Sequence, residues 1–118
     1  MPKVSVVIIS YNMKREVPRT VHSFLPPYQT GLSAGDVEIL VMENGSPDPI
    51  PQDIISSWGP EVRYVKVPDA SPSPADALNL GVEMARAPVV CPVIDGARMA
   101  SPGLLSRSLK ALQDHENA

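Results

Sequence analysis

Four runs of mostly branched apolar residues recur along the chain and predict the strands of a sheet. The runs span residues 4–9, 37–42, 62–67 and 89–94. The first is almost continuously apolar, as expected of a strand that is covered on both faces in a parallel sheet. The intervals between the runs leave room for helices. This alternation predicts an α/β fold, an open and mostly parallel Rossmann-like sheet with helices on both faces.

The expected strand order is 3-2-1-4, which places the run 89–94 at an edge of the sheet. An unpaired apolar edge favours self-association at high concentration. Before the second strand, Val17, Val21 and Phe24 recur at helical spacing, with Pro18 in the first turn. Residues 51–58 leave room only for a short helix.

The third helix has the clearest signals. Ser73 is the expected N-cap, and Pro74 suits the first helical position. An apolar stripe then includes Ala77, Gly81 and Val82. A glycine inside a helix costs about 1 kcal/mol relative to alanine, so Gly81 indicates close backbone packing.

The fourth helix is predicted to open in the same way as the third. Ser101 and Pro102 would begin it, and Leu105, Leu109 and Leu112 would share its apolar face.

Composition and charge then exclude several classes of function. The 118 residues are 43% hydrophobic and carry a net charge of −3, without a basic stripe, which disfavours nucleic acid as a partner. The apolar run that follows Met1 is too short for a signal peptide or a transmembrane segment, which predicts a cytoplasmic domain. The single cysteine, Cys91, can form neither an internal disulfide nor a multi-thiolate metal site.

Candidate chemistry lies where the strands end, because open α/β sheets bind ligands at the carboxyl ends of their strands. The first run leads into Ser10-Tyr11-Asn12, the second into Glu43-Asn44-Gly45-Ser46, and the fourth into Asp95-Gly96-Ala97-Arg98. Any one of these segments could simply be a polar turn. The sequence contains neither a G-x-G-x-x-G motif after the first strand nor a G-x-x-x-x-G-K-[ST] motif, which disfavours dinucleotide binding and P-loop chemistry.

Four motifs in the same order resemble family 2 glycosyltransferases of the GT-A fold. They are the strand that ends in Ser10-Tyr11-Asn12, the Glu43-Asn44-Gly45-Ser46 element, Ala77-x-Asn79-x-Gly81 with Ala85, and Val93-Ile94-Asp95-Gly96-Ala97 at the place of the family's D-x-D motif. The resemblance implies that residues 1–118 form the half of the enzyme that binds a nucleotide-sugar donor, with a UDP-sugar expected.

The resemblance also implies roles for individual residues. Ser10, Tyr11 and Asn12 would line the pocket for the nucleobase and ribose, where an aromatic ring offers a stacking platform. Glu43 would accept a hydrogen bond from the base, because an ionised carboxylate is an acceptor and the uracil ring N–H is a donor. Asn79 is assigned to the same substrate site.

Asp95 corresponds to the first aspartate of D-x-D, near the ribose and diphosphate, and Ala97 stands where the family has a second carboxylate. Alanine cannot bind Mg²⁺ or Mn²⁺, so a metal would rely on Asp95 and the phosphates. Arg98 offers another way to offset the diphosphate charge, since a guanidinium matches phosphate oxygens.

The resemblance gives no acceptor site and no catalytic base, which family members carry in a further half. We therefore expect this chain alone to be inactive. The alternative is a non-catalytic α/β module, either a degenerate nucleotide-sugar binder or a flavodoxin-like regulatory domain. A regulatory domain of the receiver type would need more acidic residues at the strand ends and a lysine soon after Asp95, whereas the next lysine is Lys110. The sugar, the acceptor and the oligomeric state remain open.

Overall fold

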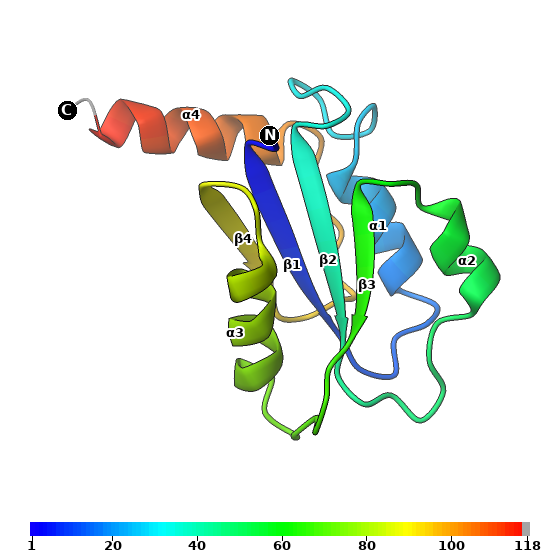
Figure 1. Cartoon of the computed structure of the whole chain (residues 1–118). Helices are drawn as coiled ribbons and strands as arrows, with labels where there is room; N and C mark the ends of the chain where they lie inside the picture. Colours follow the sequence, from blue (N-terminus) through cyan, green and yellow to red (C-terminus); the bar gives the residue numbers. More distant parts are fainter. Residues whose placement is uncertain (117–118) are drawn as a thin grey trace.

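The computed structural model describes residues 1–116, with side chains up to residue 114. It contains a four-stranded sheet in the order β3-β2-β1-β4, and every neighbouring pair of strands is parallel (Figure 1). The expected order and the expected edge position of the fourth strand are both confirmed. The strands are β1 (Val4–Ser10), β2 (Val37–Glu43), β3 (Val62–Lys66) and β4 (Val89–Val93).

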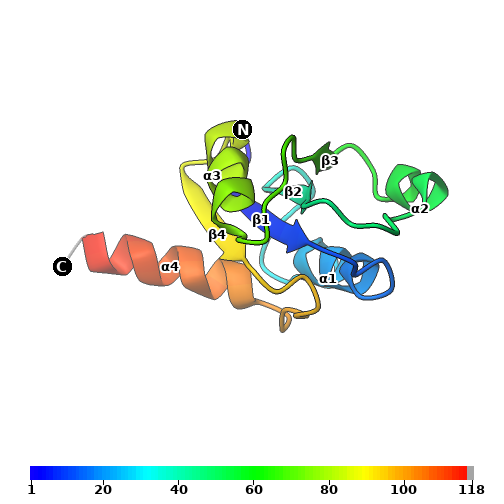
Figure 2. The ribbon, with the colours of Figure 1, turned by 90° about the horizontal axis from the view of Figure 1, so that it is seen from below.

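Helices cover both faces of the sheet, as predicted. Figure 2 views the sheet from the carboxyl ends of its strands, with α3 on one face and α1 on the other. Apolar side chains of α2 and α4 pack into the same core as α1. The helices are α1 (Val17–Phe24), α2 (Gln52–Ser57), α3 (Ala75–Met84) and α4 (Leu104–Glu116).

Two apolar cores form because side chains alternate between the faces of a strand. From β1, Val6 and Ile8 enter the core beneath α1, whereas Val7 and Ile9 enter the core beneath α3. Each fully buried aliphatic side chain contributes about 1.5–3 kcal/mol relative to an exposed one. The central strands β1 and β2 are buried along their whole length, which explains their nearly continuous apolar sequence.

Gly81 packs α3 directly against the sheet. A Cβ atom at this position would lie 2.4 Å from Cγ1 of Val7 and 3.3 Å from Cγ of Met42. The expectation of close backbone packing at Gly81 is therefore confirmed. Val82, expected on the same stripe, is instead 46% exposed.

Both predicted helix starts are displaced along the chain. Pro74, not Ser73, is the N-cap of α3, since its carbonyl oxygen accepts the bond from the Leu78 N–H (2.9 Å). The Ser73 hydroxyl instead accepts from the Ala75 N–H (3.2 Å). Helix α4 begins two residues after Pro102, because Gly103 has a φ of +83° and cannot continue a right-handed helix.

Helix α4 projects past the edge of the sheet beyond β4 (Figure 1). Leu105 is buried and Leu109 packs on the core, but Leu112 is 47% exposed, so the expected stripe is covered only in its first two turns. Pro92 lies within β4, an edge strand, where the lack of a backbone N–H is tolerated. Among the described residues, no helix is both long and apolar enough to span a membrane.

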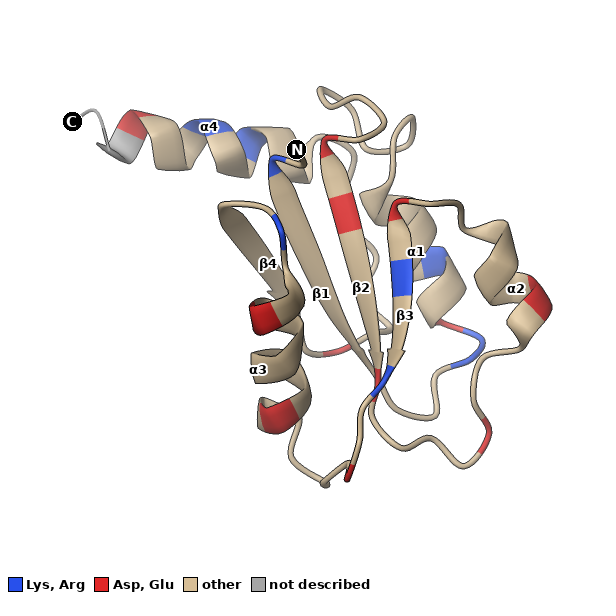
Figure 3. Ribbon diagram, viewed as in Figure 1, with Lys and Arg blue, Asp and Glu red and all other residues tan. Residues whose placement is uncertain are grey.

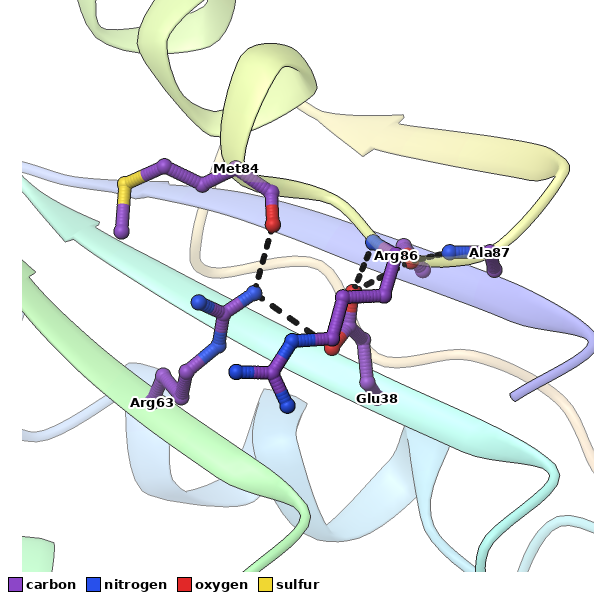
Figure 4. A network of polar contacts seen from close by, with 6 residues as sticks. Glu38, Arg63, Met84, Arg86 and Ala87 are labelled. Carbon is purple, nitrogen blue, oxygen red and sulfur yellow. Dashed lines mark hydrogen bonds and ion pairs between the residues drawn. The ribbon is translucent and has the colours of Figure 1, made fainter. Parts of the chain in front are cut away.

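A buried carboxylate ties the turn after α3 to the middle of the sheet. Figure 3 shows acidic colour in β2 beside basic colour in β3. The Glu38 carboxylate of β2 pairs with the Arg63 guanidinium of β3 at 3.4 Å. Oε1 of Glu38 accepts from the Ser5 hydroxyl (2.7 Å) and from the Arg86 N–H (2.6 Å). Figure 4 shows Arg63 bridging Glu38 (3.4 Å) and the carbonyl oxygen of Met84 (2.7 Å).

Candidate functional site

A cleft of about 470 Å³ opens at the carboxyl ends of the strands, where the sequence places its candidate chemistry. Its walls come from the ends of β1 and β4 and from the loops after β2 and β3. They include Tyr11, Asn44, Gly45, Ser71, Pro72 and Ile94. A larger, shallower groove of about 700 Å³ lies between the chain start, the turn before β4 and α4, and none of its lining residues is acidic. The smaller cleft is the candidate site because polar loops converge on it.

The buried carboxylate of Glu43 connects the segments that surround the cleft. Glu43 is the last residue of β2, is 4% exposed and is not among the residues that line the cleft. Oε1 accepts a hydrogen bond from the Ser46 hydroxyl, and Oε2 accepts from the Tyr64 hydroxyl (2.9 Å). The Ser46 Oγ in turn accepts from the Asn12 N–H (2.7 Å). Glu43 thereby links segments that follow β1 and β2 to strand β3.

Burial raises the pKa of the Tyr64 hydroxyl, and the hydrogen bond to Glu43 and the negative charge of Glu43 raise it further. Tyr64 therefore stays protonated and acts as a donor throughout the neutral and mildly alkaline range.

Asn44 is part of the cleft lining, but its side-chain oxygen is buried. It is 6% exposed, and its Nδ2 donates to the carbonyl oxygen of Ser71 (3.1 Å), which fixes the orientation of the amide. Its own N–H donates to the carbonyl oxygen of Ser10 (2.8 Å). Within residues 1–116, the buried Oδ1 of Asn44 accepts no hydrogen bond. A buried acceptor without a partner is costly, so a donor brought by a ligand would be bound favourably.

The structure divides the predicted segment Ser10-Tyr11-Asn12. Tyr11 lines the cleft, and its side chain is 53% exposed, so one part of the ring remains accessible. Ser10 is fully buried, and its Oγ has no hydrogen-bond partner within the described part of the chain. Asn12 is exposed and has a φ of +54°, a left-handed conformation that asparagine tolerates. Of the three side chains, only that of Tyr11 is in the cleft lining.

Asp95 and Arg98 lie on the loop after β4, next to Ile94 of the cleft lining but not in it. Oδ1 of Asp95 accepts from the Ala97 N–H (3.0 Å), and Oδ2 lies 3.6 Å from Nε of Arg98. Both side chains are more than half exposed. The two charges form a surface pair that contributes little to stability, so each is free to exchange its partner for a ligand.

The donor set does not by itself fit a metal ion. No group of three or more His, Cys, Asp or Glu side chains is close enough to hold one anywhere in the described structure. At the loop after β4, Asp95 is the acidic residue, and Ala97 supplies no side-chain ligand. The loop offers one guanidinium, that of Arg98, to an anionic ligand, with the Asp95 carboxylate beside it.

Asn79 is not brought to the cleft. It is an exposed residue of α3 outside the lining, although Pro74, just before this helix, is part of it. The predicted site residues therefore fall into four groups. Tyr11 lines the cleft, and Ser10 and Glu43 are buried behind the lining. Asp95 and Arg98 lie beside the cleft, and Asn12 and Asn79 are exposed outside its lining.

Sequence reasoning did not single out Asn44, Tyr64 or Ser71, which complete this site. Asn44 belongs to the Glu43-Asn44-Gly45-Ser46 motif. Its place immediately after a buried strand could have indicated a residue of the binding site. Tyr64 bonds to Glu43, 21 residues away in the chain, and Ser71 bonds to Asn44, 27 residues away. No local sequence pattern predicts such distant contacts.

Comparisons with known proteins identify the family and the fold of this chain. Residues 5–118 match the family model described as glycosyl transferase family 2. A search of curated proteins found no match.

Among solved structures, S. aureus TarS 1-349 is similar to this chain with a TM-score of 0.82 at 18% identity, covering 97% of this chain and 33% of that one. A second structure of S. aureus TarS gives the same TM-score and identity, with 20% of its chain covered. This chain thus spans about a third or less of the TarS chains it matches. The likeness shows the α/β fold expected from the sequence, of the GT-A type, and the family match covers nearly the whole chain. The chain belongs to glycosyl transferase family 2.

Proposed function

We propose that this chain is the donor-binding part of a glycosyltransferase, and that the cleft holds the nucleoside of a nucleotide-diphosphate sugar, with a UDP-sugar as the expected donor. The observation that carries the proposal is that Asn44, a residue of the cleft lining, has a buried Oδ1 that accepts no hydrogen bond from the described residues. Binding would turn this oxygen toward the base. An amide oxygen accepts from a ring N–H, which the uracil base presents. The volume of about 470 Å³ is within the range of small-ligand sites.

The aromatic ring of Tyr11 is the second element of this pocket. Tyr11 lines the same cleft as Asn44 and is 53% exposed, so its ring would offer a face for the base to stack on. In this arrangement Glu43 acts through Ser46 and Tyr64, because both of its oxygens already accept hydrogen bonds. The acceptor role that the resemblance implied for Glu43 thus moves to its neighbour, Asn44.

The diphosphate is proposed to lie over the loop after β4. Arg98 is 81% exposed and its guanidinium can contact phosphate oxygens, while the acidic Asp95 suits ribose hydroxyls as an acceptor. Transfer of the sugar by a complete enzyme requires a base that removes the proton of the acceptor hydroxyl. We assign no described residue to that role and propose that the isolated chain binds the donor without turnover.

A second candidate is a module that binds a nucleotide sugar without catalysis. The alanine at position 97, in place of a carboxylate, favours it. Fusing the chain to the acceptor-binding part of another family member separates the two, because only a glycosyltransferase part would then release UDP from a UDP-sugar.

NMR titration of the labelled chain with UDP tests the proposed site. We expect the largest amide shifts at Tyr11, Asn44, Gly45 and Ser71, with none at Leu109 in the opposite groove. Shifts confined to that groove, or absent at millimolar UDP, would contradict the proposal.

A further inference from the structure

Three polar side chains are completely buried on the face of the sheet that α1 covers. Thr20 and Ser23 belong to α1, and Gln29 follows that helix by five residues. All three are 0% exposed. A buried polar group must be satisfied by hydrogen bonds, so their partners indicate what the groups do.

All three side chains bond to the backbone of one segment, residues 96–105, which connects β4 to α4. The Thr20 hydroxyl donates to the carbonyl oxygen of Gly96 (2.6 Å), and the Ser23 Oγ accepts from the Ala100 N–H (2.9 Å). Gln29 donates to the carbonyl oxygen of Ser101 (3.2 Å) and accepts from the Leu105 N–H (2.9 Å). We call Thr20, Ser23 and Gln29 the polar clamp.

Two residues of the polar clamp also donate hydrogen bonds to backbone carbonyl oxygens of α1. Ser23 donates to the carbonyl oxygen of Thr20 (2.7 Å), and Gln29 donates to the carbonyl oxygen of Ser23 (2.8 Å). Each clamp residue is therefore fixed both to the α1 region and to the segment that it holds. Figures 1 and 2 show this segment passing along the α1 face between the end of β4 and the start of α4.

Close packing fixes the start of the same segment. A Cβ atom on Gly96 would lie 2.7 Å from the carbonyl oxygen of Ile9 and 3.0 Å from Cγ2 of Val17. The backbone at Gly96 thus touches both β1 and α1, and Thr20 bonds to it at that point. The segment has little room to shift at this end.

The charged residues around Gly96 are held much less directly. Asp95 contacts the Ala97 N–H and the Arg98 side chain, both within its own turn. The Arg98 N–H closes this turn by donating to the carbonyl oxygen of Asp95 (3.1 Å). These bonds close the turn locally, but its position relative to the cleft, and how readily it opens, depend on how the flanking backbone is held at Gly96 and Ala100.

We propose that the polar clamp positions the loop of Asp95 and Arg98 for the donor diphosphate, so that Thr20, Ser23 and Gln29 are positioning residues for a site none of them touches. This inference rests on the proposed function, because it takes the diphosphate to lie over that loop. Its distinctive consequence is that removing a clamp hydroxyl weakens binding of the diphosphate without weakening binding of the nucleoside.

The test uses the full chain with Thr20→Val, which removes the hydroxyl at nearly constant volume, and Thr20→Ser, which keeps it. Ser23→Ala is a second clamp variant. The matched control is Ser57→Ala, since the Ser57 hydroxyl donates to the carbonyl oxygen of Ile54 (2.6 Å) within α2, away from the loop. Calorimetry measures UDP and uridine binding well below the unfolding temperature, and NMR measures amide exchange at Ala97 and Arg98 without ligand.

We expect Thr20→Val and Ser23→Ala to weaken UDP binding about five- to tenfold, to leave uridine binding within twofold, and to speed exchange at Ala97 and Arg98. Thr20→Ser should restore UDP binding, and Ser57→Ala should change neither quantity. Equal losses for UDP and uridine, or unchanged amide exchange in both clamp variants, would overturn the inference. If the unmodified chain fails to bind UDP, the proposed function fails. In that case, the exchange rates of the Ala97 and Arg98 amides without ligand still test whether the clamp holds the loop. Faster exchange in Thr20→Val and Ser23→Ala would support it, and unchanged exchange would overturn it.

Discussion

The hydroxyl of Tyr64 donates a 2.9 Å hydrogen bond to Oε2 of Glu43 and joins β3 to the end of β2 beside the cleft. Because Ser46 donates to the other oxygen of Glu43 and accepts from the Asn12 N–H, one carboxylate connects the segments after β1 and β2 to the middle of β3. This arrangement makes Glu43 a support for the cleft, and we propose Asn44 as the residue that bonds to the ligand.

Tyr64→Phe should lower the free energy of unfolding by about 1.5–3 kcal/mol, because it removes a hydrogen bond to a charged group and leaves Oε2 of Glu43 without that donor. Urea unfolding at pH 7 measures the change. Since the pKa of Tyr64 is raised in the folded state, the contribution of the protonated hydroxyl is complete below about pH 10, its unfolded value, and fades only as the pH rises above that. The control is Tyr28→Phe. An equal loss in both variants would mean that the bond to Glu43 contributes nothing specific.

Gly81→Ala should destabilise the chain by about 1–3 kcal/mol, although alanine is the better helix former. The added Cβ would meet Cγ1 of Val7 at 2.4 Å. Val7→Ala removes that methyl group, so the double variant should be more stable than the sum of the two single losses predicts. Denaturant unfolding of the four proteins completes the cycle. A stabilising Gly81→Ala would show that α3 does not pack as closely as described.

Acid should weaken the Glu38 network. Burial by itself would raise the pKa of Glu38, but the hydrogen bonds from Ser5 and the Arg86 N–H and the charge of Arg63 outweigh it, so the pKa is lowered. A carboxyl group with a lowered folded pKa stabilises the fold above its unfolded pKa, about 4.5, and this stabilisation is lost as the pH falls through the folded value. Glu38→Gln should therefore be less stable than the unmodified chain at pH 7.

The difference in unfolding free energy between Glu38→Gln and the unmodified chain should shrink from pH 6 to pH 3. Glu83→Gln, at an exposed position of α3, is the control and should show no such trend. A constant difference for Glu38→Gln across this range would contradict the account of the network.

Mn²⁺ should improve UDP binding by less than about twofold in the unmodified chain, because Asp95 and the diphosphate alone would hold it. Ala97→Asp adds a carboxylate two residues from Asp95 and should make UDP binding metal-dependent. Ala97→Asn has the same size without the charge and serves as the control. Calorimetry with and without Mn²⁺ measures the effect, and strong metal dependence in the unmodified chain would show that another carboxylate completes the site.

The arrangement of the sheet could be predicted because its signals are local. The four apolar runs match β1 to β4 within one or two residues, and Gly81 marked the close contact of α3. The start of α4 was missed because the left-handed φ of Gly103 follows from the tertiary path of the loop. Leu112 was misplaced because periodicity gives a helix face but does not reveal whether another element covers it.

The candidate site was predictable only in part. The rule that ligands bind at strand carboxyl ends located the cleft and Tyr11. It could not show that the Glu43 carboxylate is already occupied by Ser46 and Tyr64, since Tyr64 lies 21 residues away in the chain. The polar clamp depends on contacts across more than 70 residues, which no single segment of the sequence reveals.

Calorimetric titration of UDP into the unmodified chain and into Asn44→Ala tests the central claim most directly. The account predicts that UDP binds in preference to ADP and that Asn44→Ala weakens UDP binding by about 1–3 kcal/mol, since it removes the acceptor that faces the base. Ser108→Ala, on the exposed side of α4, should leave the affinity unchanged. Binding of UDP and ADP with equal affinity, or full affinity in Asn44→Ala, would contradict the account.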